Sequence, residues 1–334
     1  MFNILPWHVQ HWNHLVMQFR KQRLPHALLL VGAKGLGKQA LARNLATLLL
    51  CHQEGLREDI HGIPCGNCKG CLLLAAGNHP DLTSIAAEED NGVIKIDQIR
   101  EMVESLHSAA HQKGWRVVII EQAELMNLAA ANALLKTLEE PAAKTMLILT
   151  TVHANKLPAT IRSRCQKLAI HVPSHTVAEP WLQDRLPGVD VKLLLVLANG
   201  APLQVLSWGM TEFFSRRKAL LEHIYALVFD RNCWEAALNA AMVFDLNEFV
   251  LLLMYVTLDL VKLKLLVSST LVNEDEIVKL TALAAVADLP KIFAYQQELF
   301  RLKEYLLDKF NFNRRMIFER LVIDWMRCFV HDTK

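Results

Sequence analysis

The spacing of apolar residues changes character near residue 173. Before it, short apolar runs of the kind found in buried strands alternate with stretches whose apolar positions recur at helical spacing. The expected strands cover residues 27–31, 117–120, 146–151 and 167–172, and the expected helices include 39–50 and 127–140. Strands that alternate with helices predict a parallel sheet that is covered by helices on both faces.

After residue 173 the strand-like runs disappear and helical spacing takes over. A short helix is expected at 191–199, ending at Gly200, and a long series of helical patterns follows. The chain is therefore expected to be α/β plus all-α, with three domains at residues 1–172, 173–210 and 211–334.

The longest apolar run, residues 249–267, is interrupted by Asp259, Lys262 and Lys264. A helix that spans a membrane needs about 20 predominantly apolar residues. Because three charged residues lie within the run, the sequence favours a helix buried in a protein core over a membrane span.

Composition narrows the class of protein further. Of the 334 residues, 52% are hydrophobic, which is enough to build large cores and excludes a disordered chain. Lys and Arg number 36 against 34 Asp and Glu, so bulk charge does not indicate a histone-like protein. The N-terminal residues show no secretory pattern, and the seven cysteines fit a reducing compartment. We therefore expect a cytoplasmic protein.

Residues 32–38 read Gly-Ala-Lys-Gly-Leu-Gly-Lys and stand between an expected strand and an expected helix. This is the G-x-x-x-x-G-K pattern of phosphate-binding loops. Gly32 and Gly37 would let the backbone wrap a phosphate, and Lys38 would reach the β- and γ-phosphates. A working loop continues with Ser or Thr, whose hydroxyl ligates Mg²⁺, but this chain has Gln39.

The acidic half of such a site is also altered. The expected strand at 117–120 is followed by Glu121 and Gln122, where an ATPase of this type would carry two acidic residues. The amide of Gln122 cannot accept the proton of an attacking water. Two interpretations stay open: an active ATPase, or a phosphate-loop fold that has lost hydrolysis and leaves ATP binding in doubt. The residues favour the second.

Four cysteines, Cys51, Cys65, Cys68 and Cys71, are concentrated in one short segment. Four thiolates at this spacing predict a Zn²⁺ site, and because four sulfurs leave no open position its role would be structural. An iron–sulfur cluster is the rival, but a ferredoxin pattern places a Cys-Pro pair three residues after the third cysteine, where this chain has leucines. The expected module covers residues 51–71.

Other groups of polar residues favour plain interpretations. Three histidines three residues apart are expected on an exposed helical face: His8, His11 and His14. The basic run 216–218 is expected to be solvated. Isolated cysteines are expected in protein cores: Cys165, Cys233 and Cys328.

Two longer motifs carry a family resemblance. Residues 132–141 read Asn-Ala-Leu-Leu-Lys-Thr-Leu-Glu-Glu-Pro, and residues 163–165 read Ser-Arg-Cys. Together with His-Pro-Asp at 79–81 and the four-cysteine module, they resemble the AAA+ subunits of the bacterial DNA polymerase III clamp loader. The resemblance is strong over the first 172 residues and extends to the layout of the rest.

The resemblance implies an AAA+ P-loop domain, a small helical lid domain and a C-terminal helical collar domain. It implies a five-membered ring with gamma/tau and delta subunits, which opens a sliding clamp and closes it around primed DNA. The lapsed loop implies a non-catalytic member of that ring, without ATPase or polymerase activity of its own. By the same resemblance Arg164 is an arginine finger that acts on a neighbouring gamma/tau ATP site.

Several features of the sequence distinguish this hypothesis from two rivals. An ATP-hydrolysing gamma/tau-like motor would carry Ser or Thr at position 39, an Asp-Glu pair at 121–122 and an arginine in the lid helix near 198–204, and this chain has none of these. A zinc-bearing module that binds DNA by itself would need basic or aromatic residues around the cysteines. Lys69 is the one basic residue between Cys65 and Cys71.

Overall fold

The structure is a computed structural model that describes residues 2–52, 62–87, 92–107, 114–266, 271–306 and 313–329. The chain divides into two compact units. The first comprises Met1–Trp181 and Ala201–Gln204, and the second comprises Leu182–Gly200 and Val205–Lys334. Among the described helices, none combines the length and the apolar character that crossing a membrane requires.

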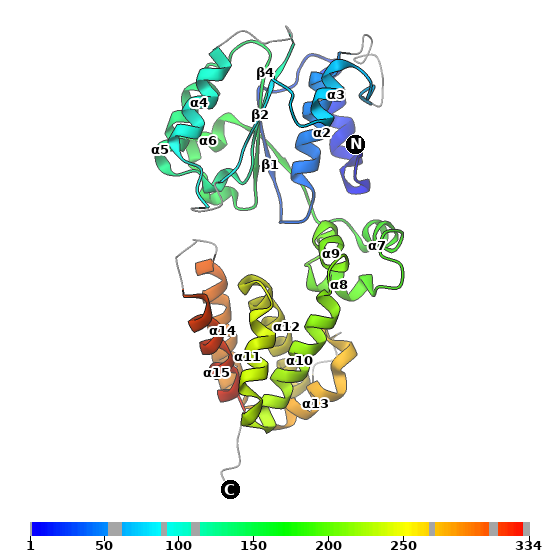
Figure 1. The fold of residues 1–334 in the computed structure, drawn as a ribbon, viewed down its shortest axis with the longest axis vertical. Coiled ribbons are helices and arrows are strands. Elements are labelled where there is room, and N and C mark those ends of the chain that lie inside the picture. Colours follow the sequence, from blue (N-terminus) through cyan, green and yellow to red (C-terminus); the bar gives the residue numbers. More distant parts are fainter. Residues whose placement is uncertain are drawn as a thin grey trace. The chain divides into compact units, whose positions relative to one another are not determined.

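The first unit contains the expected parallel sheet (Figure 1). Its five strands follow the order β2-β3-β4-β1-β5. Their bounds are β1 Ala27–Val31, β2 Leu82–Ile85, β3 Arg116–Ile120, β4 Thr145–Thr151 and β5 Gln166–Ala169. β1, β3 and β4 lie where the apolar runs predicted them, and β5 overlaps the strand predicted at 167–172 but ends at Ala169. The edge strand β2 was not predicted, because Thr83 and Ser84 break its apolar pattern.

Helices cover both faces of this sheet, as the fold class required (Figure 1). The bounds are α1 Val9–Arg20, α2 Lys38–Leu50, α3 Lys69–Ala75, α4 Ile96–His107, α5 Leu128–Glu139 and α6 Ala159–Arg164. Alternate strand residues, such as Val118 and Leu147, form one core with α4, α5 and α6. Residues of opposite parity, such as Val117 and Met146, are equally buried and face the other side, where α2 packs.

Helix α5 begins and ends where its sequence predicts. The side chain of Asn127 accepts a hydrogen bond of 2.7 Å from the backbone N–H of Ala130, which caps the first turn. The helix ends at Glu139, two residues before Pro141, which has no N–H to continue it. The same helix therefore delivers the residues of the 132–141 motif to one side of the sheet.

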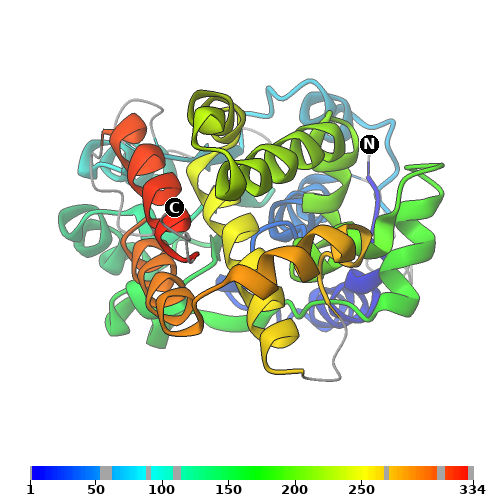
Figure 2. The same cartoon turned by 90° about the horizontal axis from the view of Figure 1, so that it is seen from below.

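The second unit is helical in its described residues. Its helices are α8 Val191–Leu197, α10 Phe213–Phe229, α11 Trp234–Met242, α12 Leu246–Lys264, α13 Ile277–Val286, α14 Leu289–Leu306 and α15 Arg314–Arg327. Helices α7 His175–Gln183 and α9 Pro202–Gly209 contain the points where the two units meet along the chain. Both views show α14 and α15 side by side (Figures 1 and 2).

The apolar run at 249–267 lies mostly in α12, and one of its three charged residues is buried inside the second unit. Asp259 is fully buried, and its carboxylate accepts hydrogen bonds from the backbone N–H groups of Val272 and Asn273. Lys264 donates to the carbonyl of Ala284 at 2.9 Å, at the end of α13. The predicted buried helix is confirmed, because most of its apolar residues and Asp259 are buried, whereas Lys264 lies at its exposed end.

Four predictions about single residues are wrong. His11 is half-buried, not exposed, and its Nε2 atom lies 3.0 Å from the carbonyl oxygen of Ala169. His8 is buried, not exposed, because Pro6–His8 form a 3₁₀ turn that places His8 on the same side as buried Leu5. Arg217 of the basic run is 1% exposed and is bound to Asp275 through two hydrogen bonds. Cys233 is half-buried, whereas Cys165 and Cys328 lie in cores as expected.

Candidate metal centre and lapsed nucleotide site

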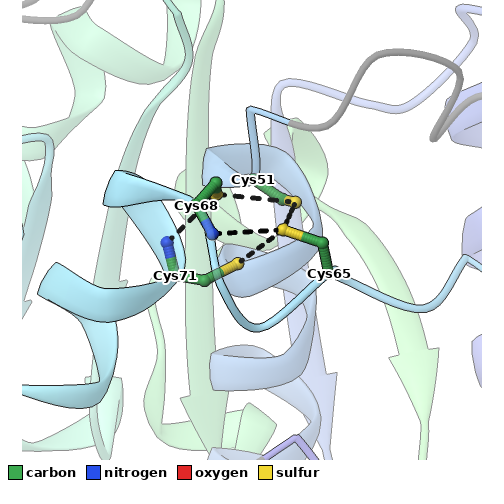
Figure 3. Close-up of side chains that lie close together, drawn as sticks. All are labelled: Cys51, Cys65, Cys68 and Cys71. Carbon is green, nitrogen blue, oxygen red and sulfur yellow. Dashed lines mark hydrogen bonds between the residues drawn. The ribbon is translucent and has the colours of Figure 1, made fainter.

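The four cysteines of the predicted module lie together in the structure (Figure 3). Helix α2 ends at Leu50 and delivers Cys51, whereas Cys68 caps helix α3, which carries Cys71. Their sulfur atoms all lie within 4.8 Å of one another, and none forms a disulfide. Residues 53–61 of the predicted module lie outside the described residues.

Three of the six sulfur–sulfur distances are close to those of a tetrahedral zinc site. A Zn–S bond of about 2.3 Å places the sulfurs of a regular tetrahedron about 3.8 Å apart. The distance is 3.6 Å from Cys51 to Cys65, 4.0 Å from Cys51 to Cys68 and 4.0 Å from Cys65 to Cys71. The cluster therefore has both the donor set and the size that Zn²⁺ requires.

Backbone N–H groups point at these sulfurs. His52 and Cys71 each donate to Sγ of Cys68 at 3.4 Å, and Cys68 donates to Sγ of Cys65 at 3.4 Å. Burial alone would raise the pKa of Cys68, but these donors and the neighbouring thiols outweigh it and lower the pKa to about 6. Burial raises the pKa of Cys71. Of these two thiols, Cys68 is therefore the one that ionises more readily.

Gly70 allows the two helices of the cluster to approach. A Cβ atom at this position would lie 2.3 Å from the carbonyl oxygen of Leu50, the last residue of α2. Because a real Cβ atom does not approach a backbone oxygen so closely, only glycine lets α3 pack here. The glycine thus fixes the separation between Cys51 and the cysteines of α3.

The phosphate loop occupies the position that its sequence predicts, between β1 and α2. Lys38 is 8% exposed, and its ammonium group donates to the carbonyl oxygens of Gly32 at 2.7 Å and Ala33 at 2.8 Å. Burial lowers the pKa of Lys38, and the carboxylate of Glu124 partly offsets that effect. The lysine that would reach a nucleotide is here bonded to its own loop.

The N-terminal segment holds the same loop from outside. The indole N–H of Trp7 donates to the carbonyl oxygen of Leu36 at 2.9 Å, and Nε2 of His8 lies 2.8 Å from the same oxygen. Burial lowers the pKa of His8 to about 4, so the ring is neutral at pH 7 and the Nε2 atom carries the proton of this bond. The histidine spacing predicts an exposed face for His8 and gives no sign of these contacts.

Helix α9 provides a further contact to the loop. The backbone N–H of Leu203 donates to the carbonyl oxygen of Gly35 at 3.0 Å, and a Cβ atom at Gly35 would lie 3.0 Å from Gln204. This is the segment in which an active motor is expected to carry an arginine. Here its backbone holds the loop.

The two residues that would hold Mg²⁺ bind each other. Nε2 of Gln39 lies 2.5 Å from Oε2 of Glu121, and the guanidinium group of Arg43 lies 3.5 Å from Oε1. Gln122, at the expected position of the catalytic base, adopts a left-handed conformation with φ of 49°. Its N–H donates to the hydroxyl of Thr150 at 3.1 Å. Glu121 is therefore already bound by two side chains, and Gln122 supplies an amide where a base is expected.

Arg164 ends helix α6 directly before β5. Its guanidinium group forms an ion pair of 2.6 Å with Oε1 of Glu139 and donates to the carbonyl oxygen of Thr160 at 3.0 Å. Glu139 belongs to the 132–141 motif, so the two motifs of the family resemblance meet at this pair. Nothing in the spacing of residues 139 and 164 predicted the contact.

Comparison with known proteins decides the family. Two family models match: "DNA polymerase III, delta subunit" over residues 7–174, and "DNA polymerase III, delta subunit, C terminal" over residues 211–327. DNA polymerase III subunit delta' of Pseudomonas aeruginosa is 32% identical over 97% of this chain and 98% of its own length. The chain belongs to the DNA polymerase III delta-prime family. The resemblance carried by residues 132–141 and 163–165 is thereby confirmed.

A second delta-prime relative also matches this chain over nearly its whole length. The subunit delta' of Yersinia pestis is also 32% identical, over 97% of this chain and 95% of its own length. Among solved structures, a DNA polymerase III gamma subunit-related protein of Thermotoga maritima is 18% identical over 94% of this chain and 99% of its own, with a TM-score of 0.46.

Proposed function

We propose that this delta-prime family chain is a non-catalytic subunit of a bacterial clamp loader. It would join gamma/tau and delta subunits in a five-membered ring that uses ATP to load a sliding clamp onto primed DNA during chromosomal replication. The observation that carries the proposal is the contact between Gln39 and Glu121. It pairs the two side chains on which a metal-dependent ATP site depends, inside a fold that otherwise keeps the layout of such a site.

The chemistry of hydrolysis in cis fails at three positions. Gln39 supplies no hydroxyl for Mg²⁺, and Glu121 is already bound to Gln39 and Arg43. Gln122 offers an amide, which cannot accept a proton from water. Gly32, Gly37 and Lys38 retain the phosphate-loop pattern, so nucleotide binding without hydrolysis is the most that this site would support.

The contribution to catalysis would come from Arg164, acting in trans. A guanidinium group that meets the γ-phosphate of a neighbouring gamma/tau site stabilises the charge of the transition state, with an effect on the order of 10³–10⁵ in rate in the strongest cases. Arg164 is half-buried and lies at the end of an exposed helix. This placement supports the role, because its N–H groups can reach an acceptor on a neighbour.

Cys51, Cys65, Cys68 and Cys71 would hold one structural Zn²⁺ ion. Four sulfurs complete its coordination, so the ion would link α2 to α3 and take no part in catalysis. Residues 173–210 would act as the lid and residues 211–334 as the collar of the ring, in the cytoplasm of a bacterial cell and at the nucleoid during replication.

The test is ATP turnover by the purified chain, first alone and then with gamma/tau, delta, sliding clamp and primed DNA. We expect no turnover alone, and turnover in the assembly that falls strongly when Arg164 is replaced by Ala. Arg162→Ala is the matched control, because Arg162 is an exposed arginine two residues away on the same helix. Equal turnover with and without Arg164 would remove the finger role.

The alternative is an ATP-hydrolysing gamma/tau-like motor, which the retained Lys38 favours. In that case the chain would hydrolyse ATP without partners, and Lys38→Ala would abolish this activity while Arg164→Ala would not. The same measurement therefore separates the two functions.

A further inference from the structure

The ion pair between Glu139 and Arg164 has a geometry that fixes the guanidinium group. Nη2 of Arg164 lies 2.6 Å from Oε1 of Glu139, while Nη1 donates to the carbonyl oxygen of Thr160 at 3.0 Å. Two acceptors on different nitrogens define the plane of the group. Since a guanidinium group carries five N–H donors, others remain for a further anion.

The acceptors are themselves held by the fold. Glu139 is the last residue of α5, whose first turn is capped by Asn127. The preceding residue, Leu138, is 1% exposed, and its carbonyl oxygen lies 3.0 Å from Nε2 of His26. Thr160 lies in α6, which packs on α5. The carboxylate is therefore attached to a rigid frame, whereas Arg164 supplies the flexible side chain.

The ion pair between Glu139 and Arg164 can orient the Arg164 side chain, and it is weak enough to break when Arg164 binds a phosphate. The side chains of Arg164 and Glu139 are 35% and 50% exposed, and solvent screens ion pairs at such sites. An arginine side chain in water is distributed over many rotamers, and this freedom is lost when it binds a phosphate. A partner that restricts the rotamers beforehand reduces that loss.

We propose that Glu139 is a positioning residue for Arg164: it holds the guanidinium group in the orientation in which the group meets the γ-phosphate on a neighbouring subunit. This inference rests on the proposed function, because it requires Arg164 to act in trans. Glu139 would touch neither the nucleotide nor the reacting atoms, and its entire effect on turnover would pass through Arg164. A carboxylate that competes with the phosphate for Arg164 would have the opposite effect.

The experiment compares Glu139→Ala, Arg164→Ala and the double variant in the assembled clamp loader, with clamp and primed DNA present. We expect Glu139→Ala to lower kcat for ATP about two- to fivefold, the range set by a half-exposed ion pair, with little change in KM. In the Arg164→Ala background the Glu139 substitution should have no further effect. A residue with only a structural role would slow both backgrounds alike.

Glu140→Ala is the matched control, since Glu140 is an exposed carboxylate next in sequence and forms no ion pair within the described parts of the chain. It should leave turnover unchanged. The Glu139→Ala and Arg164→Ala variants should match the wild type in urea unfolding and in assembly by gel filtration. Normal or faster turnover by Glu139→Ala, or an additive loss in the double variant, would overturn the positioning role. Normal turnover by Arg164→Ala would instead overturn the finger itself.

Discussion

Gln39 donates a hydrogen bond from Nε2 to Oε2 of Glu121, across the sheet edge at which a metal-dependent ATP site would hold its cation. The contact joins two departures from the ATPase pattern that stand far apart in the sequence. A hydroxyl at position 39 would be too short to keep it. The amide of Gln39 thus stands where the hydroxyl ligand of Mg²⁺ is expected, and it also binds the carboxylate that would assist this ligand.

Restoring the hydroxyl alone should not restore hydrolysis. We expect Gln39→Thr to remove the amide partner of Glu121, leaving Arg43 beside it, but to leave phosphate release at the background rate, because Gln122 still cannot accept a proton. Phosphate release by the purified variant is measured over hours, beside a Gln39→Thr, Gln122→Glu double variant. Appreciable turnover by the single variant would mean that another group serves as the base.

Removing one sulfur should release the metal. The protein should contain about one zinc ion per chain, and Cys68→Ser should lose it and melt at a lower temperature, because a metal that binds only the folded state stabilises that state. Elemental analysis and thermal unfolding test both points. Cys233→Ser, which alters a half-buried thiol outside the cluster, is the control. A wild-type protein free of metal after purification without chelators would contradict the site.

His8 should make the stability of the first unit depend on pH. Burial lowers its pKa from the ordinary value of 6.5 to about 4 in the folded protein. Between these values the unfolded chain binds the proton more readily, so stability is full above pH 6.5 and falls as the pH drops toward 4. The loss amounts to about 2 kcal/mol at pH 5.

Urea unfolding at pH 7.5 and pH 5 measures this effect. His8→Gln keeps a side-chain donor for the carbonyl of Leu36 but does not titrate, so its stability should change about 2 kcal/mol less than that of the wild type. Protonation of the thiol cluster affects both proteins alike. His14→Gln, at an exposed position, should behave as the wild type does. Identical pH dependence of the His8 variant and the wild type would show that His8 is protonated in the folded state.

Arg217 should be essential to the second unit. It is 1% exposed and binds Asn273 at 2.7 Å and Asp275 at 2.7 Å and 3.0 Å, which attaches the segment before α13 to α10. Arg217→Met leaves those acceptors without their donor and should lower the free energy of unfolding by about 3 kcal/mol. Lys218→Met, on the exposed side of the same helix, should cost little. Equal stability of the two variants would contradict this account.

The sequence predicted those features that depend on local patterns. Apolar runs located β1, β3, β4 and β5, and the cap and stop signals of Asn127 and Pro141 located α5, because these signals act within a few residues. The spacing of the four cysteines predicted their convergence for the same reason.

Features that depend on distant partners were missed. The burial of His8 depends on the carbonyl of Leu36, and that of Arg217 on a segment more than fifty residues away. The pair between Arg164 and Glu139 forms only because α5 and α6 pack together. A single sequence shows the residue types at such positions, but not the three-dimensional neighbour that gives each its role.

The thiol cluster also has a consequence for the folding equilibrium of the chain. Cys51 and Cys65 stand 14 positions apart, and an ion bound to both in the folded protein holds these two positions together. Because the ion binds only the folded state, its stabilisation grows with the free ion concentration. A zinc cross-link, unlike a disulfide, dissolves when the ion is withdrawn. The folded fraction of this chain would therefore rise and fall with the free zinc concentration in the cell. A shortage of zinc would lower the amount of folded subunit.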